Sequence, residues 1–144
     1  NGTSWTEEND LNTDRAYAQA ATQGTTTASL VFGGYTGSVS DYTESFNGTS
    51  WTEVADLNTA RTRTGGSGTQ TAAVCFGGDP GPVGITETWD GSSWAEQADL
   101  NTSRSDLTGF GTSSLALAAA GRPPTTGATE EWTVTASAET VAFD

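Results

Sequence analysis

The stretch NGTSWTEENDLNTDR at residues 1–15 recurs as NGTSWTEVADLNTAR at 47–61 and as DGSSWAEQADLNTSR at 90–104. The copies start 46 and then 43 residues apart, at positions 1, 47 and 90. A period of this length is typical of stacked supersecondary units, none of which can bury its apolar face alone. The sequence therefore predicts a single repeat domain over residues 1–144. Its units span 1–46, 47–89 and 90–132, followed by a non-repeating C-terminal strand or tail at 133–144.

Each unit carries the signals of antiparallel strands. A compact apolar run ending in glycine, at 28–34, 72–78 and 115–121, predicts a buried central strand rather than a helix. Alternating side chains around Asn47-Gly48 and Asp90-Gly91 predict the two arms of a hairpin. These dipeptides favour a two-residue turn in which both residues have positive φ. A short inner strand of small residues, after the recurring arginine, brings the prediction to four strands per unit.

The order of these motifs resembles the kelch repeat. Along the chain follow an arginine after a short turn, a strand ending in Gly-Gly, an acidic-x-aromatic strand, a turn and a tryptophan. The resemblance covers residues 1–132 and departs from the pattern at Ala120-Gly121, where the other units have Gly-Gly. It implies an all-β β-propeller of four-stranded antiparallel blades, three per chain. The NGTSW and TAR phrases are also similar to kelch-like repeats in structural proteins of phages and environmental viruses.

Three blades are too few to close a ring, because propellers typically have four to eight. Residues 1–8 have the pattern of an outermost strand without inner companions before it, and the third unit has no NGTSW partner after Trp132. We therefore predict that two copies exchange residues 1–8 as strands and form a six-bladed homodimer with two-fold symmetry. Alternatively, Val134, Ala136 and Ala138 form the missing strand, and the chain is then a piece of a longer array.

The charge of the chain is one-sided. Eighteen Asp and Glu residues against five Arg residues give a net charge of −13. Such a field repels phosphates, so neither a nucleic-acid partner nor an anionic membrane is expected. No apolar run approaches the roughly 20 residues of a membrane-spanning helix. We interpret the acidic surface as a means of solubility rather than of cation binding.

The residue types exclude most catalytic sites. The chain has no His, no Lys and a single cysteine, Cys75, which is expected in the core. A Ser-His-Asp triad, a Cys-His pair, a Schiff-base lysine and an imidazole-ligated metal are all excluded. The copper-radical oxidases built on kelch-type propellers need histidine ligands and are excluded with them. Glu130 and Glu131 leave glycoside hydrolysis open, although adjacent strand residues point to opposite faces and pair poorly. We predict no enzyme activity, no catalytic residue and no cofactor.

A partial calcium-loop motif is present near the start of the chain. Asp10, Asn12 and Asp14 have the D-x-N-x-D spacing with which such a loop begins. Arg15 stands where the loop needs glycine, and Ala21 where it needs a bidentate glutamate. Turn capping by Asp and Asn explains the motif better, so no metal site is predicted.

The recurring acids Glu44, Glu87 and Glu130 and the recurring arginines have the character of scaffold. A residue that is repeated in every unit generally serves the structure of the unit. We expect ion pairs and backbone hydrogen bonds that join the blades.

The positions at which the units disagree indicate a candidate site. Two residues after the recurring arginine, and again directly after the glycine pair or its Ala-Gly counterpart, each unit has a chemically different side chain. Such positions lie beside the inner strand or on a connecting loop, where partners commonly bind. The alternative is drift at tolerant surface positions. The candidate residues for ligand or partner binding are Tyr17, Arg63, Asp106, Tyr35, Asp79 and Arg122.

These observations favour a non-enzymatic binding or structural module that acts through a propeller face, within an extracellular or virion assembly. A carbohydrate-binding, lectin-like propeller is the alternative, because aromatic rings with small hydroxyl residues suit a sugar. A glycoside hydrolase is the third hypothesis. Mixed charges at the variable positions would suit a protein partner.

Overall fold

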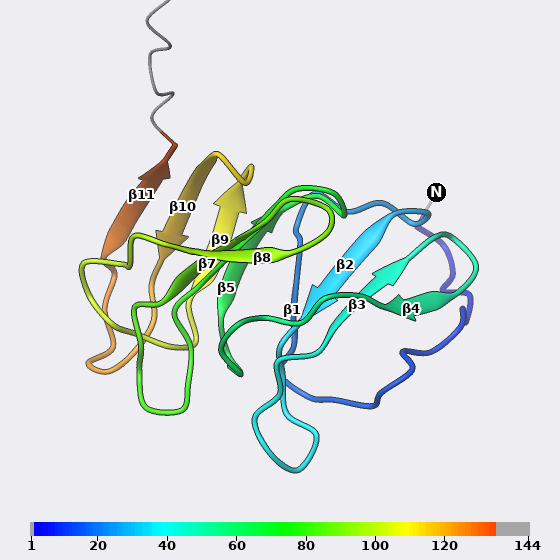
Figure 1. Ribbon diagram of the computed structural model, residues 1–144, viewed down its shortest axis with the longest axis horizontal. Coiled ribbons are helices and arrows are strands. Elements are labelled where there is room, and N and C mark those ends of the chain that lie inside the picture. Colours follow the sequence, from blue (N-terminus) through cyan, green and yellow to red (C-terminus); the bar gives the residue numbers. More distant parts are fainter. Residues whose placement is uncertain (1, 135–144) are drawn as a thin grey trace, which may run out of the picture.

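The computed structural model describes residues 2–134 and shows three antiparallel β-sheets lying side by side (Figure 1). Within these residues the chain forms no helix, and so none that is long and apolar enough to cross a membrane. The strand order is β1-β2-β3-β4 in the first sheet, β5-β6-β7-β8 in the second and β9-β10-β11 in the third. The strands are β1 (Gln19–Ala20), β2 (Ser29–Phe32), β3 (Thr43–Phe46), β4 (Trp51–Glu53), β5 (Gly65–Gly68), β6 (Ala73–Phe76), β7 (Thr86–Trp89), β8 (Trp94–Gln97), β9 (Thr108–Gly111), β10 (Leu115–Ala119) and β11 (Thr129–Thr133).

The chain takes the same path in each sheet. The apolar run forms the central strand, β2, β6 or β10, between a short inner strand and the first hairpin arm. The second hairpin arm, β4 or β8, is the outermost strand of the first two sheets. The predicted all-β chain of antiparallel units is therefore confirmed, with four strands in two sheets and three in the last.

The hairpin connection is longer than predicted. Strand β3 ends at residue 46 and β4 begins at 51, so residues 47–50 form a four-residue loop in which Gly48 alone has a positive φ, 92°. The side chain of Asn47 explains the difference. Its Oδ1 accepts the backbone N–H groups of Thr49 and Ser50, both at 2.9 Å, and this local bonding replaces the tight two-residue turn.

Asp90 has the same part in the second sheet. Its Oδ1 accepts the Ser92 hydroxyl and backbone N–H, both at 2.8 Å, and the Ser93 N–H at 2.9 Å. These bonds, with the Ser92 hydroxyl bond the largest cause, stabilise the carboxylate and lower the pKa of Asp90 to about 2.

The two ends of the repeat frame differ from the expectation for a complete sheet. The predicted outermost strand at the start of the chain is not formed by residues 2–8, because no neighbouring strand offers them backbone partners. In the third sheet β11 is the outermost strand of the described residues. Val134 continues past β11 and donates its N–H to Ser114 O at 3.0 Å. The predicted strand residues Ala136 and Ala138 lie outside the described residues.

The core lies between the sheets. Leu30 and Phe32 of β2 form one buried cluster with Ala73 and Cys75 of β6, so large side chains of the first sheet meet small ones of the second. The ring of Trp94 closes this cluster edge-on to Phe32, with ring centroids 4.9 Å apart. Burial raises the pKa of the Cys75 thiol, which therefore stays protonated at neutral pH.

A second cluster joins the second and third sheets in the same way. Val74 and Phe76 of β6 pack with Ala116 and Ala118 of β10, and all four side chains are buried. Alternation along β6 thus turns its small residues to the first sheet and its large ones to the third. At both interfaces the earlier sheet supplies the large side chains and the later sheet supplies the small ones.

One glycine contact sets how closely the sheets approach. A Cβ at Gly109 would lie 2.3 Å from the carbonyl oxygen of Gly66, which is backbone and cannot rotate away. The inner strands β5 and β9 therefore pack nearly backbone on backbone, which only glycine permits.

Candidate functional site

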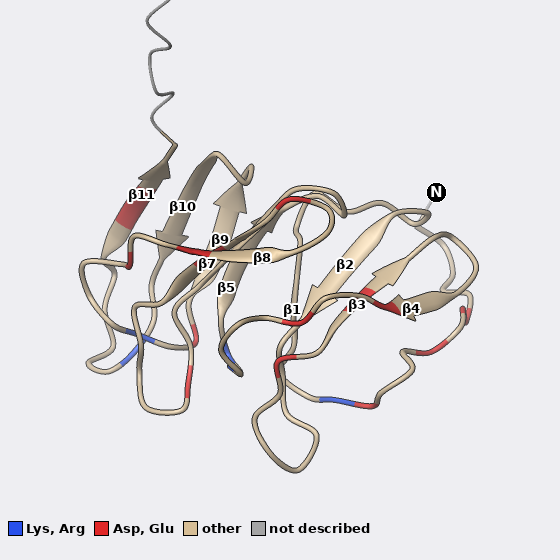
Figure 2. Ribbon diagram, in the orientation of Figure 1, with Lys and Arg blue, Asp and Glu red and all other residues tan. Residues whose placement is uncertain are grey.

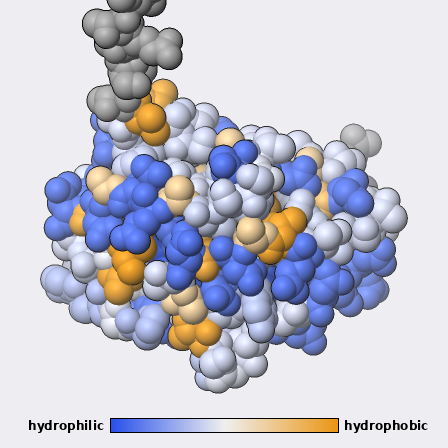
Figure 3. All heavy atoms as spheres, viewed as in Figure 1, coloured by the Kyte–Doolittle hydropathy of each residue, from blue (hydrophilic) through white to orange (hydrophobic). Residues whose placement is uncertain are grey.

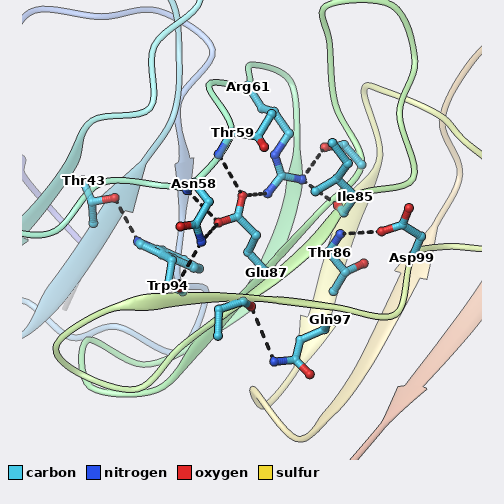
Figure 4. A network of polar contacts seen from close by, with 12 residues as sticks. Thr43, Asn58, Thr59, Arg61, Ile85, Thr86, Glu87, Trp94, Gln97 and Asp99 are labelled. Carbon is cyan, nitrogen blue, oxygen red and sulfur yellow. Dashed lines mark hydrogen bonds and ion pairs between the residues drawn. The ribbon is translucent and has the colours of Figure 1, made fainter.

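A buried glutamate organises the centre of the second sheet (Figure 4). Glu87 on β7 is fully buried, and its Oε2 accepts both the backbone N–H and the side-chain N–H of Asn58, each at 2.8 Å. Its Oε1 pairs with Arg61 at 2.9 Å. Arg61 donates in addition to the carbonyls of Gly77 and Ile85, at 3.0 and 2.6 Å. A buried charge pair needs such satisfaction of its remaining hydrogen-bonding groups.

The other two sheets contain the same ion pair. Arg15 lies 3.1 Å from Glu44, and Arg104 lies 3.2 Å from Glu130, whose side chain is 16% exposed. Burial lowers the pKa of Arg15, and the charge of Glu44 opposes that effect. Asparagine donors, the counterparts of Asn58, bind the glutamates in these sheets. The predicted ion pairs are present, but each lies within one sheet instead of joining two, and they make these residues part of the scaffold.

The same arginines join neighbouring sheets through their backbone. The Arg61 carbonyl accepts the N–H of Gly34 in the first sheet at 2.9 Å, while its side chain binds within the second sheet. The Arg104 carbonyl likewise accepts the N–H of Gly78 at 2.9 Å. The side chain of each of these arginines thus stabilises its own sheet, and its backbone carbonyl binds the preceding sheet.

The calcium-like motif serves this scaffold. Asn12 binds Glu44 through its backbone and side-chain nitrogens, at 2.7 and 2.9 Å, and Trp51 O through its side chain at 2.9 Å. In the part of the chain that the structure describes, no three His, Cys, Asp or Glu side chains gather to hold a metal ion.

The six variable residues come together on one side of the molecule. Within each sheet the two variable positions are neighbours, because the residue before the first one pairs with the second. Paired backbone hydrogen bonds of 2.8–3.0 Å close these bridges. The bridges are Ala16 with Tyr35, Thr62 with Asp79, and Ser105 with Arg122.

A backbone ladder crosses from sheet to sheet at the first variable position. Tyr17, Arg63 and Asp106 all have left-handed backbone, with φ of 54°, 54° and 53°. The N–H of Arg63 donates to Tyr17 O at 3.2 Å, and the N–H of Asp106 donates to Arg63 O at 2.9 Å. Non-glycine residues seldom adopt this conformation. The ladder holds the backbone the same in all three sheets while the side chains differ.

The side chains on this ladder contact one another. Arg63 lies over the ring of Tyr17, 4.7 Å from its centroid, and close to two carboxylates, 3.6 Å from Asp79 and 3.8 Å from Asp106. Arg122 forms a further ion pair with Asp106, and this bond raises the pKa of Arg122. Four of the variable positions therefore form one connected polar network across the second and third sheets.

We call these six residues the variable face. Tyr17 and Tyr35 are 59% and 44% exposed. The side chains of Arg63 and Arg122 are 33% and 54% exposed, whereas those of the other three arginines are at most 1% exposed. Because the chain has no lysine, the variable face carries all the solvent-accessible side-chain cations of the protein. In Figure 2 the arginine segments all lie in the lower half of the view.

Three loops border the variable face. They connect the central strand to the first hairpin arm and project downward in Figure 1, in cyan, green and orange. Each is closed at its base by a backbone bond to a glycine carbonyl: Ser40 to Gly34 at 2.9 Å, Val83 to Gly78 at 3.0 Å, and Thr126 to Gly121 at 3.1 Å. The loops YTGSVS (35–40), DPGPVG (79–84) and RPPTTG (122–127) differ in sequence above these shared bases.

Sequence reasoning missed two parts of this arrangement. It assigned the repeated asparagine of DLNT to a turn, although Asn58 also binds Glu87 and the Trp94 carbonyl. The fixed identity of this asparagine in all three copies was the available signal. It also missed the ladder between sheets, for which the sequence carries no signal.

A scan against protein-family models and a search of curated proteins both return no match to this chain.

Proposed function

We propose that the chain is a non-enzymatic binding module built as part of a kelch-like β-propeller, and that a partner binds its variable face. The propeller assignment is supported by three sheets of the same strand order, set side by side and joined inner strand to inner strand (Figure 1). The single observation that carries the function is the contrast between fixed backbone and changing side chains. Tyr17, Arg63 and Asp106 share one φ within 1° and share the ladder, yet offer a ring, a cation and an anion.

A protein partner with mixed charge fits this face best. The variable face combines two arginines, two aspartates and two tyrosines, so this face has no net charge although the chain has a net charge of −13. An acidic segment of a partner is repelled by most of the molecule and meets cations only here. Tyrosine and arginine are also the side chains that contribute most to protein interfaces. An extracellular or virion assembly is the setting we propose for such a partner.

The exposed tyrosines favour a glycan as the second candidate. Tyr17 and Tyr35 lie in the same sheet and both are exposed, and the backbone of Tyr35 pairs with Ala16, the residue next to Tyr17. Aromatic faces flanked by polar groups are suited to sugar rings. In this case the binding is centred on the first sheet rather than on Arg63.

The non-enzymatic part of the proposal is supported by the state of the acidic residues. Glu44 and Glu87 are buried in ion pairs, and Glu130 is held by Arg104 and Asn101. Its neighbour Glu131 lies in the alternating pattern of β11, so the two carboxylates point apart. Carboxylates held in this way are not free to transfer protons in hydrolysis.

The test uses two arrays, one of random-sequence peptides and one of glycans, probed with the fluorescently labelled 144-residue chain. We expect peptide binding that is lost in Arg63→Ala and retained in Tyr42→Ala, an exposed tyrosine outside the variable face. Glycan binding that is lost in Tyr17→Ala instead establishes the second candidate. Ligands that bind all of these variants equally, or no binding on either array, would refute the proposed face.

A further inference from the structure

A pocket lies between the second and third sheets, beside β11, the outermost strand of the third sheet within residues 2–134. It is lined by side chains of β6, β7 and β11 and of the segment that leads to Arg104. The lining residues on which the inference depends are Phe76, Thr86, Leu100, Asn101, Glu130 and Trp132.

The equivalent place between the first and second sheets holds a tryptophan. Trp94 of β8 packs there against Phe32 and Trp89, with ring centroids 4.9 and 5.5 Å apart. Its indole N–H donates to the hydroxyl of Thr43 at 3.1 Å, and it shares a buried cluster with Leu57. When the repeats are aligned, each pocket residue corresponds to a residue near Trp94. Phe76, Thr86, Leu100, Asn101, Glu130 and Trp132 correspond to Phe32, Thr43, Leu57, Asn58, Glu87 and Trp89.

Two tryptophans correspond to Trp94 in the repeat: Trp51, which lies on β4 of the first sheet, and Trp5. The segment NGTSWTEE (1–8) matches NGTSWTEV (47–54), which contains β4, and DGSSWAEQ (90–97), which contains β8. Trp5 is 102% exposed in the single chain, and residues 2–8 form no strand. Its own chain cannot deliver it to the pocket, since the N-terminus and β11 lie at opposite ends of the molecule (Figure 1).

The outward face of the third sheet shows the same incompleteness. Leu117 of β10 is 43% exposed, whereas its counterparts Leu30 and Val74 are fully buried by the following sheet. Phe110, paired with Leu117 across β9 and β10, is 55% exposed. Figure 3 shows hydrophobic surface at this end of the molecule, next to the grey trace.

The first sheet presents a face that complements these side chains. Its outward-facing residues on β2, Ser29 and Val31, correspond to Ala73 and Cys75 on β6, the small residues that receive Leu30 and Phe32. A first sheet placed after a third sheet would therefore repeat the large-to-small contact at Leu117, although Ala119 stands where the other sheets have Phe32 and Phe76.

We propose that residues 2–8 of a second copy form the fourth strand of the third sheet and that Trp5 of that copy fills this pocket. The exchange is reciprocal and gives a closed ring of six sheets with two-fold symmetry, in which each third sheet packs on the first sheet of the partner. The register of β3 with β4 and of β7 with β8 places Trp5 opposite Trp132 and Thr6 opposite Glu131. The Trp5 indole N–H then donates to the hydroxyl of Thr86.

The ring also completes the variable face. The ladder that runs from Tyr17 O to Arg63 N and from Arg63 O to Asp106 N continues from Asp106 O to the N–H of Tyr17 in the partner. Each variable residue then occurs twice around one centre, so a partner of the variable face meets two equivalent sites.

Disulfide trapping tests the predicted register. In a Cys75→Ala background, the double variant Thr6→Cys, Glu131→Cys places two thiols at opposed positions, whose Cα separation of about 4.5–5.5 Å suits a disulfide. We expect a covalent dimer that reducing agent converts to monomer. The control is Thr6→Cys with Gly127→Cys, a loop position at which an added Cβ would meet no atom within 4 Å. No covalent dimer, an intramolecular disulfide, or equal trapping in the control would overturn the proposal.

The variant Trp5→Ala tests the pocket independently. The folding of a single chain does not depend on a fully exposed tryptophan, so this variant keeps its circular dichroism spectrum. Sedimentation velocity is expected to show a dissociation constant of the dimer raised at least about 30-fold, the effect of truncating a central interface anchor. Glu96→Gln, at an exposed position on β8 of the second sheet, is the control and leaves the dimer unchanged. A Trp5→Ala variant that associates as the parent chain does, or a parent chain that is monomeric, would contradict the exchange.

Discussion

The Glu87→Gln variant should unfold at a markedly lower denaturant concentration than the parent chain. The substitution keeps the shape of the side chain but removes the charge that pairs with Arg61 in a fully buried site. It also puts an amide nitrogen among donors, because both carboxylate oxygens accept N–H groups, from Asn58, Thr59 and Arg61. The variant therefore leaves a buried cation without its partner and sets a donor against donors.

The expected loss follows from burial. Breaking a buried ion pair by removing one partner costs about 3–5 kcal/mol. Glutamine retains one acceptor oxygen, and Arg61 keeps its bonds to two backbone carbonyls, so we expect about 3 kcal/mol. This is a large part of the roughly 5–15 kcal/mol by which domains are stable. With a urea dependence of about 1–3 kcal/mol per M, the unfolding midpoint falls by about 1–3 M.

Urea unfolding followed by tryptophan fluorescence measures this change, with all variants at one protein concentration so that any association is held constant. Glu96→Gln is the matched control, since Glu96 is the exposed residue directly opposite Glu87 on β8. It should change the free energy of unfolding by less than about 0.5 kcal/mol. A Glu87→Gln variant within about 1 kcal/mol of the parent chain would refute the scaffold role of the buried pair.

Three further predictions follow from the fold. Gly109→Ala should destabilise the chain by about 1–3 kcal/mol or more because its Cβ meets the Gly66 carbonyl, while Gly127→Ala, with open space around it, should be neutral in the same urea titration. Because the pKa of Asp90 is lowered to about 2 in the folded chain, its carboxylate stabilises the fold above about pH 4, and this contribution is lost as the pH falls toward 2. The Asp90→Asn variant has the residue type of Asn47 at this position and should not lose this stability at low pH. A difference in the free energy of unfolding between variant and parent that stays constant from pH 5 to pH 2.5 would contradict the lowered pKa of Asp90. Cys75 is fully buried and its pKa is raised, so a thiol reagent such as DTNB should modify it only as fast as the chain unfolds, whereas rapid reaction of the native protein at pH 8 would contradict its place in the core.

The strand content of the fold was predictable from local sequence. Within one sheet, strand pairing and packing determine where apolar side chains alternate and where small ones are needed. The sequence shows this in the apolar runs, the hairpin arms and the small residues of β5, and it does so in three copies. The hairpin loops were predicted incorrectly, because Asn47 and Asp90 bind the backbone two and three residues ahead instead of adopting positive φ. Backbone and side-chain bonding compete there, and the dipeptide alone does not decide between them.

The candidate site was predictable in position but not in geometry. Comparing the units identified Tyr17, Arg63 and Asp106 as variable, and the structure places all three on one ladder. Their left-handed backbone could not be anticipated, since Tyr and Arg seldom adopt it, and it arises from hydrogen bonds between sheets. The ion pair of Arg63 with Asp106 depends in the same way on how closely the second and third sheets approach, which the contact of Gly109 with Gly66 allows.

The mass of the unmodified chain in solution tests the closed ring most directly. Light scattering during size-exclusion chromatography, at several loading concentrations, measures it without a label or a substitution. Two copies that exchange residues 2–8 predict a folded species of about twice 14.8 kDa. A folded species of 14.8 kDa at every concentration would contradict the exchange and leave Trp5 and the outward face of the third sheet exposed.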